Sequence, residues 1–518
     1  MGIYIYGHIA PHRVSPDAWA KTYEDSLKVV KAGDLACFEM YEKEGESYHS
    51  LVPSVDKNSQ WIAIGDMHTG SCIEDFSLCR DIGRYALEKE PTQEHPILDF
   101  LYANKSKIES DSDTTEYFFS KTQGKRPHMF LLAIACMIAS DFPEAAAVTG
   151  DITHASCIRA CDLAGKVLGR KIDLPLQYDI PRLYKALTDA GYTGEELAKR
   201  FLYIYSGVKD KSYCDFIKQK FTIKEEKPYF LEKHKTNSVW ALAKEFLECG
   251  YDHTLDALCE LVSERENAAE ELVNALVIGK VHIEKKSLYD FTENSQDNAK
   301  PDDAEMLFAR VMAALSGMQN RAIDTFITLD EQKKTLKKHF PNDDIDALYE
   351  KAFSEDNPDQ QIQKRVDRQY EKVAEMADKK PKEEYDIKDT SLLYFWESTD
   401  NTISPHVSGI CEQIIEAAWN FSGNQIANGR LDTPEKQFDY VKSSLKERFA
   451  LPKEKIDYLH EIKSNTEILR WYVGLFLIRL SDSEISDTVT AFLFNRPLFE
   501  HMIGRFFENQ QVENGQTE

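Results

Sequence analysis

The spacing of hydrophobic positions changes between about residue 215 and residue 240. Before this point, apolar residues that alternate with polar ones predict short strands. These strands are expected at 3–9, 36–41, 48–52, 61–64 and 145–149. Beyond Ser238 the alternation almost disappears, and apolar residues recur with the spacing of amphipathic helices. The pattern predicts an α+β fold, with an N-terminal mixed α/β region followed by a predominantly α-helical C-terminal half.

Three helices are predicted with clear starts or clear buried faces. Ser15 and Pro16 form the N-cap and first-turn proline of a helix that extends to about residue 31. Met129–Ala139 is apolar throughout and is expected to be a buried helix. Leu469–Leu480 is apolar on nearly every face, which predicts the central helix of a C-terminal bundle. Capping boxes are expected before and after that helix, at Ser464/Glu467 and Ser481/Glu484.

Polar stretches divide the chain into predicted domains. Residues 287–303 and 379–389 are polar or charged and are expected to be linkers, and residues 106–115 are expected to form an exposed acidic loop. The predicted domains are 1–215 (mixed α/β), 236–378 (helical) and 386–508 (helical bundle), followed by a polar tail at 509–518.

One short sequence occurs twice in the N-terminal region. GDMHTGSCIEDFSLC at Gly65–Cys79 aligns without gaps with GDITHASCIRACDLA at Gly150–Ala164. Each copy follows an apolar strand, and each is expected to begin a helix, over about 71–86 and 156–168. Ser71 and Glu74 are expected to form a capping box for the first helix. The sequence therefore predicts a repeated strand-Gly-Asp-helix unit and leaves open whether it reflects a duplication.

The aspartates of these two copies have two interpretations. In the first, Asp66 and Asp151 each cap the start of a helix by accepting backbone N–H bonds. In the second, Asp66 and His68 lie at the carboxyl edge of a sheet, where α/β proteins bind ligands. A carboxylate oxygen and an imidazole nitrogen suit a divalent transition metal such as Mn, Fe or Zn. The first interpretation is the one expected.

A resemblance to a known family of metal-dependent enzymes leads to the same second interpretation. IAIGDMHTG resembles the GDxHG motif of the calcineurin-like metallophosphoesterases, and VTGDITH resembles their second motif. The resemblance implies that Asp66, His68 and Asp151 are metal ligands, with His154 nearby. The third motif of that family is Gly-Asn-His, whereas the nearest string here is Gly-Asn-Gln at 423–425.

Composition and charge narrow the classes of partner. The chain has 518 residues, 42% of them hydrophobic, and 88 acidic against 63 basic residues, which gives a net charge of −25. This balance argues against nucleic acid as the main ligand.

The ten cysteines show no CxxC pair, so reduced thiols that fill buried helix faces are expected rather than a zinc site. No secretory signal and no apolar run of about 20 residues is visible, so a bacterial cytoplasmic protein without a membrane span is expected.

No nucleophile elbow, P-loop, dinucleotide fingerprint, HExxH or EF-hand pattern occurs in the chain. The expectation is therefore an intracellular, non-catalytic protein-binding or regulatory protein, and no cofactor is expected. The acidic contact surface is expected on the helical half, facing a protein partner with a basic surface, as in a toxin-neutralising or adaptor protein. The alternative is a metal-dependent, phosphoesterase-like hydrolase that uses Asp66, His68 and Asp151.

Overall fold

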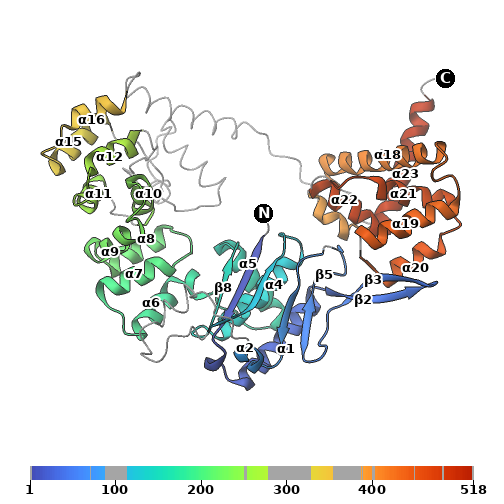
Figure 1. Ribbon diagram of the computed structural model, residues 1–518, viewed down its shortest axis with the longest axis horizontal. Helices are drawn as coiled ribbons and strands as arrows, with labels where there is room; N and C mark the ends of the chain where they lie inside the picture. Colours follow the sequence, from blue (N-terminus) through green and yellow to red (C-terminus); the bar gives the residue numbers. More distant parts are fainter. Residues whose placement is uncertain are drawn as a thin grey trace, which may run out of the picture. The chain divides into compact units, whose positions relative to one another are not determined.

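The computed structural model describes residues 3–70, 72–87, 114–249, 254–277, 328–353, 387, 389–398, 403–448, 450–480 and 483–515. In this part of the chain all but one of the strands precede residue 151, and most later elements are helices (Figure 1). The predicted α+β fold class is therefore confirmed. The linker at 287–303, most of the charged stretch at 379–389, most of the loop at 106–115, and the capping residues Ser71 and Ser481 lie outside the described residues.

The residues group into two compact units. The first contains 1–95, 110–175 and 383–518, and the second contains 96–109 and 176–382. Both ends of the chain thus belong to the first unit, although the two ends were predicted as separate domains. The sequence pattern did not reveal this pairing.

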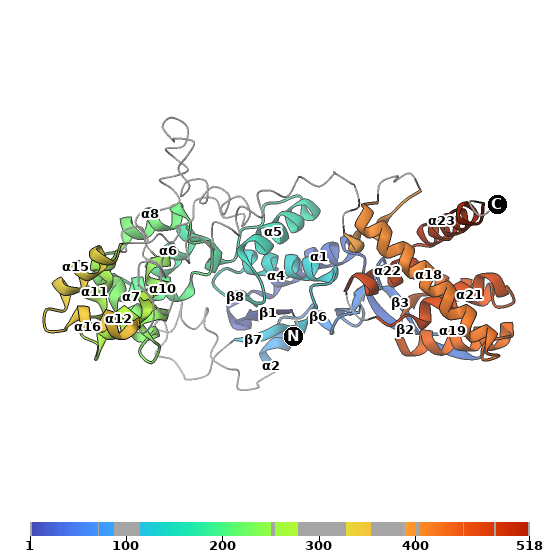
Figure 2. The ribbon, with the colours of Figure 1, turned by 90° about the horizontal axis from the view of Figure 1, so that it is seen from above.

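A three-stranded antiparallel sheet forms the centre of the N-terminal region, in the order β7-β1-β8. Its strands are β1 (Tyr4–Ile9), β7 (Thr115–Lys121) and β8 (Ala146–Gly150). Ile5 and Ile9 of β1 are buried, whereas the alternate side chains are half-exposed, as strand geometry requires. The almost wholly apolar helix α4 packs on β1 and β8 and is itself contacted by α1 and α5 (Figure 2). These helices are α1 (Pro16–Ala32), α4 (Pro127–Asp141) and α5 (His154–Leu168).

A long hairpin joins the N-terminal region to the C-terminal bundle. It consists of β2 (Leu35–Lys43) and β3 (Glu46–Pro53), within a four-stranded sheet of order β5-β2-β3-β9. The other strands are β5 (Gly65–Asp66) and β9 (Leu451–Pro452). The hairpin turn needs positive φ at both central residues, Glu44 (51°) and Gly45 (82°), which matches a type I′ turn. β9 pairs in parallel with β3, with Ser50 opposite Leu451.

The helix predicted over 71–86 is wrong. β6 (Phe76–Cys79) pairs with β4 (Gln60–Ala63), and only the short helix α2 (Gly83–Leu87) follows. Phe76 and Leu78 are buried and alternate with half-buried neighbours, so the segment has the two-residue period of a strand. The strand-Gly-Asp-helix arrangement is present at the second copy, where α5 follows β8.

The C-terminal bundle contains six helices among its described residues, preceded by the short 3-10 helix η4 (Thr390–Phe395). They are α18 (Pro405–Ala427), α19 (Pro434–Arg448), α20 (Lys453–Glu461), α21 (Thr466–Leu477), α22 (Ser483–Phe494) and α23 (Arg496–Gly515). α21 is buried at almost every position from Leu469 to Phe476, which confirms its central place. Its N-cap is Asn465, whose side chain accepts from the Ile468 N–H at 3.2 Å, so the predicted capping box at Ser464 is wrong. α23 continues to Gly515, into the predicted polar tail.

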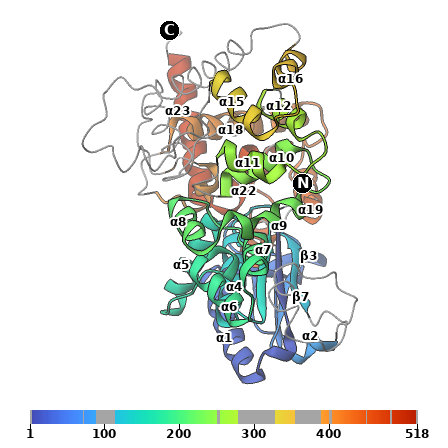
Figure 3. The same cartoon turned by 90° about the vertical axis from the view of Figure 1, so that its left-hand side faces the viewer.

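The second unit is helical throughout its described residues. Its helices are α6 (Ile180–Asp189), α7 (Gly194–Ile204), α8 (Lys211–Lys220), α9 (Ile223–Lys233), α10 (Val239–Cys249), α11 (Leu255–Val262), α12 (Ala268–Val277), α15 (Leu329–His339) and α16 (Ile345–Ala352). α15 packs on α11, and α16 packs on α12 (Figure 3). Across all of the described helices, none is both long and apolar enough to span a membrane.

Candidate functional site

Asp66 lies at the end of β5 and is completely buried. Its Oδ1 accepts hydrogen bonds from the backbone N–H groups of His68 (2.9 Å) and Thr69 (2.8 Å), and its Oδ2 accepts from the Thr69 hydroxyl at 2.5 Å. The Arg126 guanidinium, 3.3 Å away, compensates its charge. Bonds from Asp66 to backbone N–H groups within the next three residues were predicted and are present, but they close a turn, so the predicted role as a helix cap is wrong.

His68 extends toward a different part of the molecule. Its Nε2 lies 2.7 Å from the Asp34 carboxylate, and its ring packs 5.6 Å from the ring of Phe395. Asp34 follows α1 in the turn that leads into β2. The imidazole therefore links a surface turn to η4.

Asp151 follows β8 and extends the pairing of this strand with β1. Its Oδ2 accepts from the Tyr4 N–H at 2.9 Å, and its own N–H donates to the Tyr4 carbonyl at 3.0 Å. Helix α5 is capped instead by Thr153, which forms a reciprocal capping box with Ser156. The predicted capping role of Asp151 is therefore wrong. His154 is the first residue of α5.

The structure does not bring the four proposed metal ligands together. Asp66 and His68 make the contacts of the β5 turn, and Asp151 bonds to the start of β1. Among the described residues, which include all four candidates, no group of three or more His, Cys, Asp or Glu side chains could hold a metal ion. The metal-site interpretation of Asp66, His68, Asp151 and His154 thus gains no support from the geometry.

The cysteines are partly as expected. Cys157 and Cys161 are buried on α5, against the buried Cys136 of α4. Hydrogen bonds with these two thiols, followed by burial, raise the pKa of Cys136 well above its usual value, so it is not a reactive thiolate. Cys72 is exposed and Cys79 belongs to β6, so their predicted helical arrangement is wrong.

The open side of the β7-β1-β8 sheet carries a cluster of rings. Tyr4, Tyr6 and His8 project from β1, and Phe119 projects from β7 opposite Tyr6. The ring centroids of Tyr4 and Tyr6 are 5.3 Å apart, as are those of Tyr6 and Phe119, and His8 lies 6.4 Å from Tyr6. Phe119 is 61% exposed. We call these four residues the aromatic face.

Charged groups surround the aromatic face. Burial raises the pKa of the Tyr6 phenol, and the carboxylates of Asp151 and Glu116 raise it further. Burial also raises the pKa of Glu116, whose carboxylate lies 3.9 Å from Nδ1 of His8. The Lys121 ammonium lies 5.0 Å from the centre of the Tyr4 ring and pairs with Glu74 at 3.4 Å. The face thus combines stacked rings with two carboxylates, and one of its rings already receives a cation.

Three of the four residues of the aromatic face belong to a strand that the sequence predicts, and the fourth does not. The alternation of Tyr4, Tyr6 and His8 was visible as a strand pattern, but their partner Phe119 is more than a hundred residues away. Its position opposite Tyr6 depends on the β1–β7 register, which includes an irregularity between Gly7 and His8. No local signal indicates such a register.

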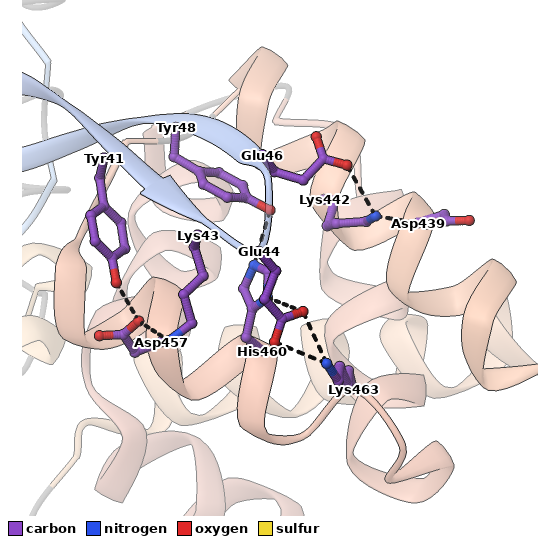
Figure 4. Close-up of polar contacts among 10 residues, drawn as sticks. All are labelled: Tyr41, Lys43, Glu44, Glu46, Tyr48, Asp439, Lys442, Asp457, His460 and Lys463. Carbon is purple, nitrogen blue, oxygen red and sulfur yellow. Dashed lines mark hydrogen bonds and ion pairs between the residues drawn. The ribbon is translucent and has the colours of Figure 1, made fainter.

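A second polar cluster holds the β2–β3 hairpin on α19 and α20 (Figure 4). Asp457 of α20 accepts from the Tyr41 hydroxyl and from the Lys43 ammonium, both at 2.6 Å. Glu46 of β3 pairs with Lys442 at 3.4 Å and with Lys446 at 2.5 Å. We call this cluster, together with the residues around His460 described next, the hairpin junction.

His460 lies at the centre of the hairpin junction. Its Nε2 is 3.0 Å from the Tyr48 hydroxyl, its Nδ1 is 3.3 Å from Glu44, and its ring packs edge-on against Phe438. Glu44 also accepts from Lys463 at 2.9 Å, and this bond, followed by that of His460, lowers the pKa of the Glu44 carboxyl. The carboxylates of this cluster are paired inside the protein, so the junction is a structural attachment rather than a binding surface.

Comparisons of the chain with known protein families, with curated proteins and with solved structures gave no match. The function is therefore inferred from the geometry of the chain's own residues. Among the described residues, Phe119 of the aromatic face is the most exposed of the large hydrophobic side chains.

Proposed function

We propose that this protein is a non-catalytic, intracellular binding or regulatory protein, and that its aromatic face contacts a partner protein with a basic surface. The observation that carries the proposal is the exposure of Phe119, at 61%, within a continuous cluster of rings. Single exposed apolar residues are ordinary, but a contiguous patch of them marks interaction sites. Aromatic side chains are also enriched at the centres of protein interfaces.

The charge around the rings selects the kind of partner. Glu116 and Asp151 lie beside Tyr6, and the chain as a whole carries a net charge of −25. A guanidinium or ammonium group of a partner can stack on a ring and pair with one of these carboxylates. The Lys121 ammonium over Tyr4 is an intramolecular example of the same contact. The acidic excess also speeds encounter with a basic partner at low ionic strength.

The cytoplasm is the compartment that this proposal assigns. Nine of the ten cysteines are recorded as free thiols, which agrees with a reducing environment. A toxin-neutralising or adaptor role fits a protein of this kind, since both act by covering or bridging a partner's surface. In either role, binding depends on surface complementarity and requires no cofactor.

The test compares two exposed phenylalanines of the same unit. Phe119→Ser removes the most exposed ring of the aromatic face. Phe421→Ser removes an equally apolar ring, which projects from α18 and is 46% exposed. Each full-length variant is used to capture proteins from its own cell extract at low and at high salt. We expect the wild type and Phe421→Ser to retain basic proteins at low salt, and Phe119→Ser not to retain them. Capture that is equal for both variants, or insensitive to salt, would contradict the proposal.

A peptide titration gives a second readout. Arginine-rich, lysine-rich and glutamate-rich peptides of equal length are compared by fluorescence anisotropy. We expect the arginine-rich peptide to bind most tightly and Glu116→Gln to weaken it, because a guanidinium both stacks and pairs. Equal affinity for the glutamate-rich peptide would remove the charge argument.

A further inference from the structure

Two adjoining cavities lie in the C-terminal bundle. The first has a volume of about 160 Å³, opens to solvent, and is lined by residues of β9, α20, α21, α22 and the start of α23. The second, of about 260 Å³, lies between α20, α21 and α23. Tyr458, Tyr472 and Arg496 line both cavities, so the two spaces meet at these three side chains.

Lys455 gives the first cavity its unusual charge. This side chain is half-buried, and none of the described residues forms a hydrogen bond or ion pair with it. Burial lowers the pKa of its ammonium and the neighbouring Arg496 lowers it further, whereas the Glu454 carboxylate partly opposes this shift. A cation removed from water without a partner is unfavourable, and a bound anion would relieve that cost.

Arg496 adds a second cation to the same wall. Its guanidinium stacks on the Tyr458 ring at 4.5 Å, and its Nε donates to Glu500 at 2.6 Å. This bond leaves the two terminal nitrogens without a hydrogen-bond partner in the described part of the chain. Glu454, which also lines the cavity, is exposed at its rim and therefore well solvated. An anion between Lys455 and Arg496 would be held by both.

Most of the second cavity is lined by apolar and aromatic side chains, and the carboxylates of Glu467 and Glu500 also line it, the latter paired with Arg496. Trp471 and Phe499 line it together with the shared Tyr472, and Ile468 and Ile503 complete its apolar walls. A planar apolar group fits such walls, since ring stacking adds to the burial of apolar surface. The two cavities together offer a charged end and an aromatic end that are in contact with each other.

We propose that these cavities form a binding site for a small aromatic anion, with its carboxylate or phosphate between Lys455 and Arg496 and its ring against Tyr472 and Trp471. The site is on a different part of the first unit's fold from the aromatic face, and it does not depend on the function proposed above. The shared chemistry is an anionic head on an aromatic body. An aromatic carboxylate and an aryl phosphate ester are the two forms that the test distinguishes.

The experiment titrates the full chain with four probes. Benzoate and phenyl phosphate carry both parts, inorganic phosphate carries the head alone, and benzyl alcohol carries the body alone. Binding is followed by isothermal calorimetry and by tryptophan fluorescence, to which Trp471 in the lining of the second cavity contributes. We expect one or both aromatic anions to bind more tightly than either partial probe. Absence of binding by both aromatic anions, or equal binding of benzyl alcohol, would overturn the proposal.

Matched lysine variants locate the site. Lys455→Met removes the cavity ammonium and keeps most of its apolar stem, and Lys453→Met removes an exposed ammonium from the same helix. We expect Lys455→Met to weaken the better probe by about tenfold or more, because a charge-assisted hydrogen bond is lost. Lys453→Met should bind as the wild type does. Equal weakening of the two variants, each shown to be folded by circular dichroism, would refute the assignment.

Chemical labelling gives an independent readout. Because the pKa of Lys455 is lowered, its neutral amine should react faster with an amine-directed reagent than Lys453 does. A bound aromatic anion should slow this reaction at Lys455 alone. Labelling of Lys455 that is unaffected by a saturating aromatic anion would contradict its place in the site.

Discussion

The helices α18 and α21 lie so close together at Gly474 that we expect the contact not to tolerate even an added methyl group. A Cβ at Gly474 would lie 2.1 Å from the carbonyl oxygen of Ala418 and 2.5 Å from its carbonyl carbon. Both are backbone atoms of the facing helix, so no side chain can rotate away. We therefore expect Gly474→Ala to force the two helices apart.

The magnitude follows from two opposing effects. In a helix, alanine is favoured over glycine by about 1 kcal/mol. Overpacking of a closed contact typically costs about 1–3 kcal/mol, and here it also disturbs the Trp419–Trp471 ring pair at 4.9 Å. At Gly409 of α18 an added Cβ meets nothing within 4 Å, so Gly409→Ala should keep the propensity gain alone. Because the propensity gain is common to both variants, they should differ by the overpacking cost, roughly 1–3 kcal/mol in the free energy of unfolding, with Gly474→Ala the less stable.

Urea denaturation followed by tryptophan fluorescence measures this difference. Trp419 and Trp471 lie beside the crossing and contribute to the emission, together with the other four tryptophans of the chain. We expect the midpoint of Gly409→Ala at or above that of the wild type, and that of Gly474→Ala clearly below it. A Gly474→Ala protein as stable as Gly409→Ala would refute the close approach of α18 and α21.

Three further outcomes are expected. Hydrogen bonds with lysines lower the pKa values of Glu44 and Asp457 in the folded protein. Because these carboxylates take up protons at a higher pH in the unfolded chain, the free energy of unfolding should fall as the pH drops below about 5. This fall should be smaller in Glu44→Gln. Thr153→Ala should lose about 0.5–2 kcal/mol in urea denaturation, whereas Thr193→Ala, whose hydroxyl makes no cap bond, should lose almost nothing. Metal analysis of the purified protein should find Mn, Fe and Zn well below stoichiometric amounts; near-stoichiometric metal that Asp66→Ala loses would revive the hydrolase alternative.

Elements with one unambiguous period could be predicted from the sequence. The helix after Ser15 begins where its cap and proline indicate, and α21 is buried on nearly every face, as its composition requires. The helix prediction for 71–86 was wrong because the few apolar residues of this segment fit the spacing of a strand as well as that of a helix. Its state is decided by the pairing of Phe76 and Leu78 with β4, which no local pattern contains.

The site predictions failed for a related reason. Asp66 and Asp151 occupy equivalent positions in two similar sequences, yet one closes a turn on Thr69 and the other bonds to Tyr4 at the start of β1. The aromatic face and the paired cavities could not be predicted, because each depends on segments that meet only in the folded chain.

The pairing of β3 with β9 has a consequence for how the chain is made. Ser50 and Leu451 are 401 residues apart, and a ribosome adding about 5–20 residues per second needs roughly 20–80 s to reach the second after the first. Throughout that interval the β3 edge has no partner strand, and open strand edges pair readily with other chains. The whole second unit is synthesised in the same interval and can fold before the first unit is complete. Chains that stop before Leu451 should therefore aggregate through the β2–β3 hairpin, even where their second unit is correctly folded.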